Sequence, residues 1–488
     1  MPDAMDLPLE LRSATELAAA VAARRVSCLE LCDSYLRRIE RLNPVLNAVV
    51  TLDAERARAR ARALDEQLAR GERIGPLHGL PITIKDAYET AGMRTTCGTR
   101  EWEDHVPTRD ADPVRRLLEA GAVVLGKSNV PAYCADLQTF NELFGVTRNP
   151  WDPSRTPGGS SGGAAAAVAS GMTAFELGSD IGGSIRTPCG WSGVYGHKPT
   201  YGIVPLLGHL PPAPGTLVQP DLGVGGPIAR SAEDLALVLS AIAAPSPAQA
   251  VAYRFALPPP RARALRDFRV GAWLHDDDFP IDDAVASLLD QTVVALERAG
   301  VRVDRGLRPG VPLREIFDDY LALLTPVTLR DVTPELLDRL TQRARTPDEE
   351  PRVAHIARAA LARHIDWLVV HERRARLSAR FAELFGRCDV LLCPITPVPA
   401  IAHDHHGSLH RRTFALGGSM RRHSELMAWI SPASACHLPA TAAPIGRTPE
   451  GLPVGVQILG PYLEDLTPIT FAAQLRDVIG GYAPPPSA

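Results

Sequence analysis

Residues 158–186 contain two serines that are each framed by glycines. Ser160 lies in the run GGSSGG, and Ser184 lies in the run SDIGGSIR. Glycine loses more conformational entropy on folding than any other residue, so a glycine cluster indicates backbone that bends sharply or approaches another group closely. Serine hydroxyls on such backbone are candidates for nucleophilic catalysis. The small side chains from Ser161 to Glu176 predict a tightly packed helix that carries one serine at its start.

Lysine is rare in this chain and is confined to the region around these serines. Lys and Arg together number 52, but the only lysines are Lys85, Lys127 and Lys198. The guanidinium of arginine does not release its proton in proteins, so arginine cannot act as a base. The three lysines are therefore candidates for proton transfer. Chance clustering in an arginine-biased chain is the alternative explanation.

One pattern in this region points to a nucleotide site. Residues 121–128, GAVVLGKS, match the phosphate-binding pattern GxxxxGK[ST]. We reject a phosphate site because Ala-Val-Val-Leu favours a buried strand rather than a loop with inward-facing amides. The following Asn-Val-Pro also places a proline where the phosphate-binding helix would begin.

A second pattern points to a Ser-His-Asp hydrolase. Residues 159–163 match GxSxG with Ser161 in the middle. That pattern needs a strand directly before the serine, but the preceding NPWDPSRTP contains three prolines. His423 and His437 follow later in the chain, so an esterase that uses Ser161 remains an alternative.

A third arrangement combines two serines with a lysine. A lysine amine can take a proton from serine only when it is neutral, and burial lowers its pKa in that direction. A second serine can pass the proton on when the nucleophile lies too far from the lysine. The amides of Ile181, Gly182 and Gly183 precede Ser184 and are candidates for an oxyanion hole. Each such donor is typically worth about 3 kcal/mol.

In wording and order, residues 75–202 resemble the amidase signature family. The segments that carry the resemblance are GPLHGLPITIKD, AGAVVLGKSNVPAY, NPWDPSRTPGGSSGG, LGSDIGGSIRTPCGW and, near the C-terminus, GLPVGVQILGP. The resemblance implies Lys85 as the catalytic lysine, Ser160 as a bridging serine in a cis peptide, and Ser184 as the nucleophile. The site it implies needs neither a metal ion nor a cofactor.

The resemblance also suggests where substrate lies. It places Tyr133 and Cys134 near the site, and we expect Gly158 and Gly159 to contact substrate as well. Asp180 and Arg186 flank the turn of the second serine; a structural ion pair is favoured there over substrate contact.

The chain is expected to form an α/β fold. Capping-box patterns at Ser13 and Ser27 predict two opening helices, and a charged helix is expected from about 53 to 70. The alternating segment LPITIKD predicts a strand that ends at Lys85. Strand and helix signals then alternate, which favours a mixed, mostly parallel central sheet covered by helices on both faces.

The resemblance implies a single amidase signature domain over residues 1–488, with its signature core at about 75–202. Residues 208–227 are too rich in Pro and Gly for a regular element, so a pocket-rim loop is expected there. The variable region of about 208–430 holds no further motif, is Arg-rich and helical over most of its length, and is expected to shape the substrate pocket.

Composition excludes several classes of function. A net charge of −4 and a pI near 6.4 argue against a nucleic-acid or anionic-membrane partner. No apolar run approaches the roughly 20 residues that span a bilayer, and the N-terminus lacks the basic and apolar parts of a secretory signal. The eight cysteines form no CxxC framework, which favours a reducing, cytoplasmic setting. The histidines between His403 and His410 resemble a metal cluster, but a solvated or pocket-rim loop is favoured.

We therefore predict a hydrolase that cleaves a carbon-nitrogen amide bond, or an amide-like carbamate, anilide or aryl ester, through an acyl-enzyme on Ser184. A component of a transfer-RNA amidotransferase is a further alternative. Such proteins usually continue after Lys-Pro-Thr into Asp-Gln-Ile-Gly-Pro, whereas DLGVGGPIARSAEDLALVL here looks like the stand-alone amidases. The expected partner is a small-molecule amide or carbamate, and the expected assembly is a monomer or homodimer.

Overall fold

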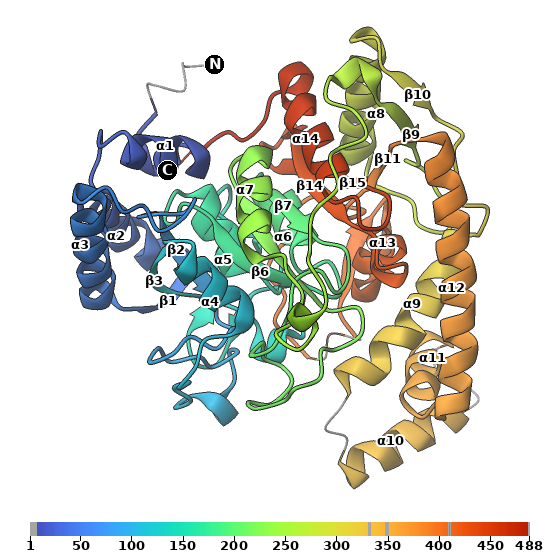
Figure 1. The fold of residues 1–488 in the computed structure, drawn as a ribbon. Helices are drawn as coiled ribbons and strands as arrows, with labels where there is room; N and C mark the ends of the chain where they lie inside the picture. The colour runs from blue at the N-terminus through green and yellow to red at the C-terminus, as the bar shows by residue number, and fades with distance from the viewer. Residues whose placement is uncertain (1–6, 330–332, 347–350, 408, 410, 487–488) are drawn as a thin grey trace.

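A single large sheet runs through the centre of the protein, and helices pack on both of its faces (Figure 1). The computed structural model describes residues 7–329, 333–346, 351–407, 409 and 411–486. The sheet has eleven strands in the order β1-β3-β2-β6-β8-β7-β14-β15-β11-β9-β10. Their bounds are β1 Val49–Leu52, β2 Pro81–Lys85, β3 Val123–Ser128, β6 Glu176–Asp180, β7 Tyr195–Lys198, β8 Val224–Ala229, β9 Arg269–Ala272, β10 Arg302–Asp304, β11 Val390–Pro394, β14 Ala440–Arg447 and β15 Pro453–Leu459. Two small hairpins lie apart from it, β4 Phe140–Asn141 with β5 Gly145–Val146, and β12 Thr413–Leu416 with β13 Ser419–Arg422.

The sheet is mixed, as the sequence predicts. The pairs β2/β3, β2/β6, β9/β11 and β9/β10 are parallel. The other neighbours, β1/β3 and the run from β6 through β8, β7, β14 and β15 to β11, are antiparallel. The parallel share is therefore smaller than the sequence analysis expects. The reason is that the chain crosses from β7 to β8 through the Gly- and Pro-rich segment rather than through a helix.

The helices form two layers. Their bounds are α1 Ala14–Ala22, α2 Cys28–Leu46, α3 Ala54–Ala69, α4 Asp112–Glu119, α5 Gly162–Ala169, α6 Arg186–Ser192, α7 Ala232–Ile242, α8 Asp283–Arg298, α9 Leu313–Thr328, α10 Pro334–Arg345, α11 Pro351–Ala360, α12 His364–Arg387, α13 Ser431–Ala435 and α14 Leu466–Ile479. Alternate residues of β11 enter different cores: Val390 and Leu392 pack with α7, α8 and α14, whereas Leu391 and Cys393 pack with α9, α12 and α13. Side chains on opposite faces of a strand thus bury both faces of the sheet. Helices α10 and α11 lie toward the far end of the long α12 (Figure 1).

The N-terminal elements follow their sequence signals. Ser13 and Ser27 cap α1 and α2, and each makes the reciprocal capping box with the glutamate three residues later. The charged helix predicted at about 53–70 is α3, and the strand predicted from LPITIKD is β2, which ends at Lys85. Residues of the rejected phosphate pattern form strand β3, so they do not make a phosphate-binding loop.

Three boundaries differ from the expectation. The small-residue helix ends at Ala169, and Glu176 begins strand β6 instead of ending that helix. The expected loop at 208–227 is irregular up to Gly223, but its last residues belong to β8 because they pair with β6 and β7. The region 208–430 contains strands as well as helices, including β9 and β11 of the central sheet.

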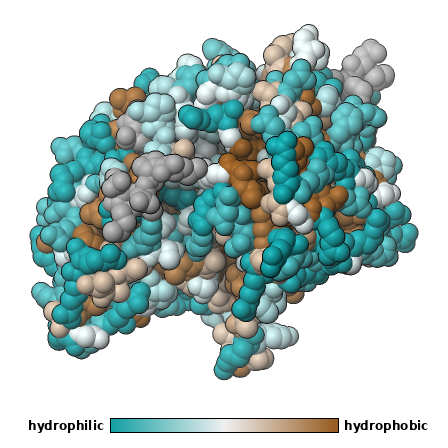
Figure 2. Space-filling model, turned by 90° about the horizontal axis from the view of Figure 1, so that it is seen from above, coloured by the Kyte–Doolittle hydropathy of each residue, from teal (hydrophilic) through white to brown (hydrophobic). Residues whose placement is uncertain are grey.

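One face of the molecule, seen in Figure 2, is largely hydrophilic, with apolar residues gathered near its middle. Among the described residues, no helix is long and apolar enough to cross a membrane.

Candidate active site

Two parallel neighbours in the sheet bring a lysine and a serine to the same edge. β2 and β6 are paired through Thr83 with Glu176, so both strands end at one side of the sheet. Lys85 is the last residue of β2 and is completely buried. Its Nζ lies 2.9 Å from the Oγ of Ser179 and 3.4 Å from the Ser179 carbonyl oxygen. The carboxyl ends of parallel strands are where α/β proteins commonly place their sites.

The first glycine-framed serine lies against the same lysine. Ser160 Oγ is 2.7 Å from Lys85 Nζ, and the Gly159–Ser160 peptide bond is cis. Ser160 is almost completely buried but lines a cavity. Burial lowers the pKa of Lys85, while the Cys134 thiolate opposes this shift. The lysine is therefore held toward its neutral form.

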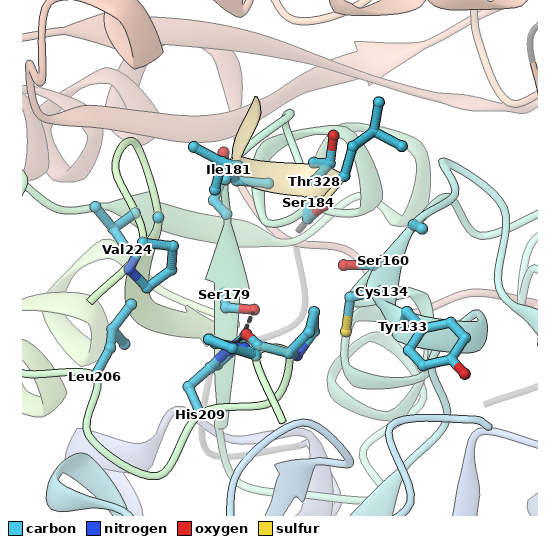
Figure 3. A pocket seen from close by; sticks show the side chains of 18 of the residues that line it. Tyr133, Cys134, Ser160, Ser179, Ile181, Ser184, Leu206, His209, Val224 and Thr328 are labelled. Carbon is cyan, nitrogen blue, oxygen red and sulfur yellow. Dashed lines mark hydrogen bonds between the residues drawn. The ribbon is translucent and has the colours of Figure 1, made fainter. Parts of the chain in front are cut away.

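The second glycine-framed serine lies on the turn between β6 and α6. Ser184 lines the same cavity as Ser160 and is 5% exposed (Figure 3). The Asp180 carboxylate, at the end of β6, accepts hydrogen bonds from the amides of Gly183, Ile185 and Arg186. These bonds fix the backbone on both sides of the serine, so the position of its hydroxyl is set by the fold.

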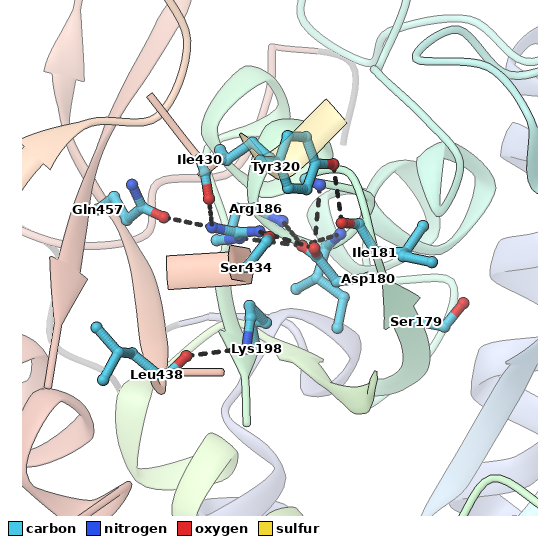
Figure 4. A network of polar contacts seen from close by, with 12 residues as sticks. Ser179, Asp180, Ile181, Arg186, Lys198, Tyr320, Ile430, Ser434, Leu438 and Gln457 are labelled. Atoms are coloured by element: carbon cyan, nitrogen blue, oxygen red, sulfur yellow. Dashed lines mark hydrogen bonds and ion pairs between the residues drawn. The ribbon is translucent and has the colours of Figure 1, made fainter. Parts of the chain in front are cut away.

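A buried arginine completes this turn. Arg186 is fully buried and pairs with Asp180, with an Nη2–Oδ1 distance of 2.8 Å (Figure 4). Its remaining N–H groups bond the Ile430 carbonyl, the Gln457 side chain and the Ser434 hydroxyl. Although burial opposes it, the Arg186 guanidinium lowers the pKa of Asp180 to about 2. The expected structural ion pair is present.

The backbone amides before Ser184 are not equivalent. The Gly183 amide donates to Asp180, whereas in the described part of the chain the amides of Ile181 and Gly182 donate to no protein acceptor. The hydroxyl of Tyr320, on α9, donates to the Ile181 carbonyl at 3.0 Å. Because C=O and N–H point in opposite directions across a trans peptide, this bond also sets the direction of the Gly182 N–H. Of the three predicted oxyanion amides, two are thus free to bind an anion.

A histidine that the sequence analysis missed orders the hydrogen bonds around Lys85. His209 Nδ1 lies 3.2 Å from the Pro211 carbonyl, and its Nε2 lies 2.8 Å from Ser179 Oγ. Burial lowers the pKa of His209 to about 3, so the ring is neutral and has one N–H. A carbonyl only accepts, so that proton is on Nδ1, and Nε2 must accept from the Ser179 hydroxyl.

The remaining donors and acceptors follow by counting. Ser179 offers Lys85 its hydroxyl lone pair and its carbonyl oxygen, so both N–H groups of a neutral Lys85 amine point at Ser179. The amine lone pair is then left for Ser160, whose hydroxyl donates to it. This direction is the one in which a proton leaves Ser160 for lysine.

These groups open into a cavity of about 510 Å³. Its polar side is formed by Ser160, Ser179, Ser184 and His209 (Figure 3). The other walls are largely apolar and are formed by Leu206, Pro211, Pro212, Pro220, Val224, Val327, Leu329 and Leu336. A volume of this size suits a small organic ligand.

The predicted substrate contacts separate into two groups. Tyr133 and Cys134 line the cavity. Gly158 and Gly159 are buried and are not among its lining residues, because they pack tightly against Pro188 and Asp136. A Cβ added to either glycine would come within 3.0 Å of backbone atoms.

The residues of the Ser-His-Asp alternative do not come together. Ser161 is fully buried, and its hydroxyl donates to the Ser179 carbonyl at 3.3 Å. His437 is bonded to Asp221, and the nearest carboxylate to His423 is that of Asp136. Within the described ranges, neither histidine is hydrogen-bonded to Ser161.

The other two lysines bond backbone carbonyls away from the cavity. Lys127 donates to the Tyr88 carbonyl and to two threonine hydroxyls, and Lys198 donates to the carbonyls of Pro199 and Leu438 (Figure 4). Both side chains are buried, and neither lines the cavity. They hold loops together, as expected of structural lysines.

The histidine-rich segment is not arranged as a metal site. His405 stacks on Phe140, and the rings of His403 and His405 lie 5.2 Å apart, centre to centre. In the described ranges, no group of three or more His, Cys, Asp or Glu side chains is placed to hold a metal ion. His410 lies outside these ranges.

Comparison with known proteins decides the family. The sequence profile of the family named Amidase matches residues 30–467, nearly the whole chain. The chain belongs to the amidase signature family. Among curated relatives of this amidase, a glutamyl-tRNA(Gln) amidotransferase subunit from Acidothermus cellulolyticus is 35% identical, over 93% of this chain and 92% of that protein.

Solved structures resemble the amidase over its full length. A bacterial aryl acylamidase of the amidase signature family superposes with a TM-score of 0.81 at 25% identity and covers 97% of both chains. A 6-aminohexanoate cyclic dimer hydrolase in complex with its substrate superposes with a TM-score of 0.78 at 26% identity, over 98% of this chain and 99% of that one. The single-domain architecture and the fold class are therefore those of amidase signature enzymes.

Proposed function

We propose that this protein hydrolyses an amide, or an amide-like carbamate, anilide or aryl ester, through an acyl-enzyme on Ser184. Lys85 is the base and Ser160 carries the proton between them. The single observation that carries the proposal is the hydrogen-bond arrangement at Lys85. It turns the amine lone pair toward the Ser160 hydroxyl, 2.7 Å away.

The proposed reaction begins with two linked proton transfers. Lys85 takes the proton of Ser160 while Ser160 takes that of Ser184, and the Ser184 oxygen attacks the substrate carbonyl. The amides of Ile181 and Gly182 stabilise the oxyanion that forms. The proton then returns through Ser160 to the leaving nitrogen, and water releases the acyl group by the same route.

The cavity supports an apolar small-molecule substrate. Its walls away from the serines are built from proline and aliphatic side chains, and no Lys or Arg lines it. A flat or aliphatic group beside the scissile carbonyl, as in an anilide or a urethane, would bury apolar surface there. We expect such a compound to be the partner of this enzyme, acting in the cytoplasm as a monomer or homodimer.

Amidotransferase activity is a second candidate because a curated relative at 35% identity carries that name. A component of an amidotransferase would pass ammonia to a partner protein, whereas a stand-alone amidase needs none. The segment DLGVGGPIARSAEDLALVL favours the stand-alone enzyme. Turnover of p-nitroanilide, ester and carbamate substrates by the purified chain distinguishes the two.

Substitution at Lys85 tests the mechanism. Lys85→Ala and Lys85→Arg should each lower kcat/KM by about 100- to 10,000-fold, because a guanidinium cannot replace the amine as a base. In the wild type, kcat/KM should rise with pH through the lowered pKa of Lys85, since the ammonium form is inactive. Substantial activity in the arginine variant, with loss in His423→Ala or His437→Ala, would favour the histidine mechanism instead.

Substitution at the serines tests the nucleophile. Ser184→Ala should abolish turnover and labelling by a fluorophosphonate. Ser160→Ala should retain more activity on esters than on amides, because an ester leaving group needs less help from the relay. A covalent adduct mapped by mass spectrometry to Ser160 or Ser161 would overturn the assignment.

A further inference from the structure

Two cysteine thiols touch each other at the wall of the cavity. Cys97 lies on the loop after β2, and Cys134 ends the short 3-10 helix Ala132–Cys134. Their Sγ atoms are 3.7 Å apart, and both cysteines are free thiols. Cys97 is fully buried, whereas Cys134 is partly exposed and lines the cavity (Figure 3). The proposed mechanism uses neither thiol.

The two thiols differ in their surroundings. The hydrogen bond with Cys97 lowers the pKa of Cys134 to about 7; burial opposes this shift, and the charge of Lys85 assists it. Burial raises the pKa of Cys97, which keeps its proton. Cys134 is thus the nucleophilic thiol, since the thiolate is the reactive form. Cys97 is held beside it as a protonated partner.

The remaining cysteines lack this combination. Burial raises the pKa of each of them: Cys28, Cys32, Cys189, Cys388, Cys393 and Cys436. All six are buried, and none lines the cavity. An oxidant that enters the cavity therefore meets one reactive thiol, Cys134.

We propose that Cys134 is a site of reversible oxidation by hydrogen peroxide, with Cys97 as the resolving thiol. The Cys134 thiolate attacks one peroxide oxygen, the O–O bond breaks, and hydroxide leaves, which gives a sulfenic acid. The Cys97 sulfur then attacks the Cys134 sulfur. The S–O bond breaks, and the hydroxyl leaves as water with the Cys97 proton. Two electrons pass from the sulfurs to peroxide, and one disulfide forms.

The backbone already holds the two segments together. The Tyr133 amide donates to the Cys97 carbonyl at 2.9 Å. A disulfide needs an S–S distance of about 2.05 Å, so the sulfurs must approach each other from 3.7 Å by side-chain rotation. The product replaces a thiolate beside Lys85 and Ser160 with a neutral cross-link. Oxidation thus changes the charge of the cavity wall without removing any residue of the proposed triad.

Peptide mapping after peroxide treatment tests the proposal. Reduced full-length protein should give a linked peptide pair joining Cys97 to Cys134, lighter by about 2 Da for the two lost hydrogens and restored by dithiothreitol. In Cys97→Ser, dimedone should trap the sulfenic acid on Cys134. In Cys134→Ser, Cys97 should remain a thiol. Cys32→Ser is the matched control, because Cys28 and Cys32 lie one turn apart in the buried face of α2, and it should cross-link like the wild type.

The wild type alone also decides the question, should a variant fail to fold. Iodoacetamide should alkylate Cys134 before any other cysteine of the native protein. Faster alkylation of another cysteine would overturn the proposal. So would peroxide oxidation at other cysteines while Cys97 and Cys134 remain thiols, or no linked peptide at all in the wild type.

Discussion

The hydrogen bond from Ser179 to His209 predicts a measurable effect on turnover. His209→Phe keeps a flat ring beside Tyr88, whose ring lies 4.8 Å from that of His209, but removes the Nε2 acceptor. The Ser179 hydroxyl can then turn and donate to the Lys85 lone pair, 2.9 Å away, in competition with Ser160. Part of the enzyme would hold the base in an unproductive arrangement.

The size of the effect follows from one neutral hydrogen bond. Such a bond contributes about 0.5–1.5 kcal/mol net. Since about 1.4 kcal/mol is a factor of ten in rate, kcat should fall about 2- to 13-fold. KM should change little if His209 acts on the base rather than on bound substrate. His209→Gln, which can still present an acceptor to Ser179, should lose less than His209→Phe.

A double-mutant cycle with Ser179→Ala provides the decisive assay. Steady-state kcat on an anilide is measured for both single variants and the double variant. If His209 acts through Ser179, the phenylalanine substitution should have no further effect once the Ser179 hydroxyl is gone. Equal losses in the presence and absence of that hydroxyl would refute the chain of hydrogen bonds from His209 to Lys85.

Three further predictions concern the turn around Ser184 and metal dependence. Tyr320→Phe should lower kcat about fivefold, for a loss of about 1 kcal/mol, because the Ile181 carbonyl loses its bond and the Gly182 amide its fixed direction; an unchanged kcat would contradict this. Arg186→Met should lower the free energy of unfolding in urea by about 3–5 kcal/mol, because it leaves Asp180 buried and unpaired, whereas Arg373→Met, which breaks the half-exposed pair with Asp319, should cost less than about 1 kcal/mol. The lowered pKa of Asp180 stabilises the wild type above pH about 4, so the difference between wild type and Arg186→Met should shrink as pH falls toward 2. Exhaustive chelation with EDTA should leave activity unchanged, and a loss restored by zinc would assign a role to the segment from His403 to His410.

Local signals predicted the parts of the site that lie on short motifs. Lys85 was expected at the end of a strand and lies at the end of β2, because an alternating apolar run needs no distant partner to be recognised. Glycines around Ser160 and Ser184 indicated tight backbone, and the structure has a cis bond at one and a turn at the other. Both serines line the cavity that Lys85 borders.

The missed residues act through contacts that no local pattern encodes. His209 lies on an irregular Pro- and Gly-rich segment, so nothing in its neighbours places it 2.8 Å from Ser179. The one available signal was that the segment 208–227 was expected at the pocket rim. Tyr320 lies in α9, more than a hundred residues from Ile181, and only tertiary packing joins them. The same holds for the parallel share of the sheet, which depends on how distant strands pair.

The buried arginine of the Ser184 turn has a consequence for synthesis of the chain. Two of its partners, Ser434 and Gln457, lie near the C-terminus, and Gln457 is on the strand β15 at the centre of the sheet. While the ribosome is still making those residues, Arg186 has no acceptor for two of its N–H groups, and the sheet lacks the strands beside β7 and β11. The nucleophile turn is encoded early but becomes rigid last. A nascent chain therefore carries both serines and the lysine long before it can bring them to bear on an acyl group, which protects the cell from a partly folded hydrolase.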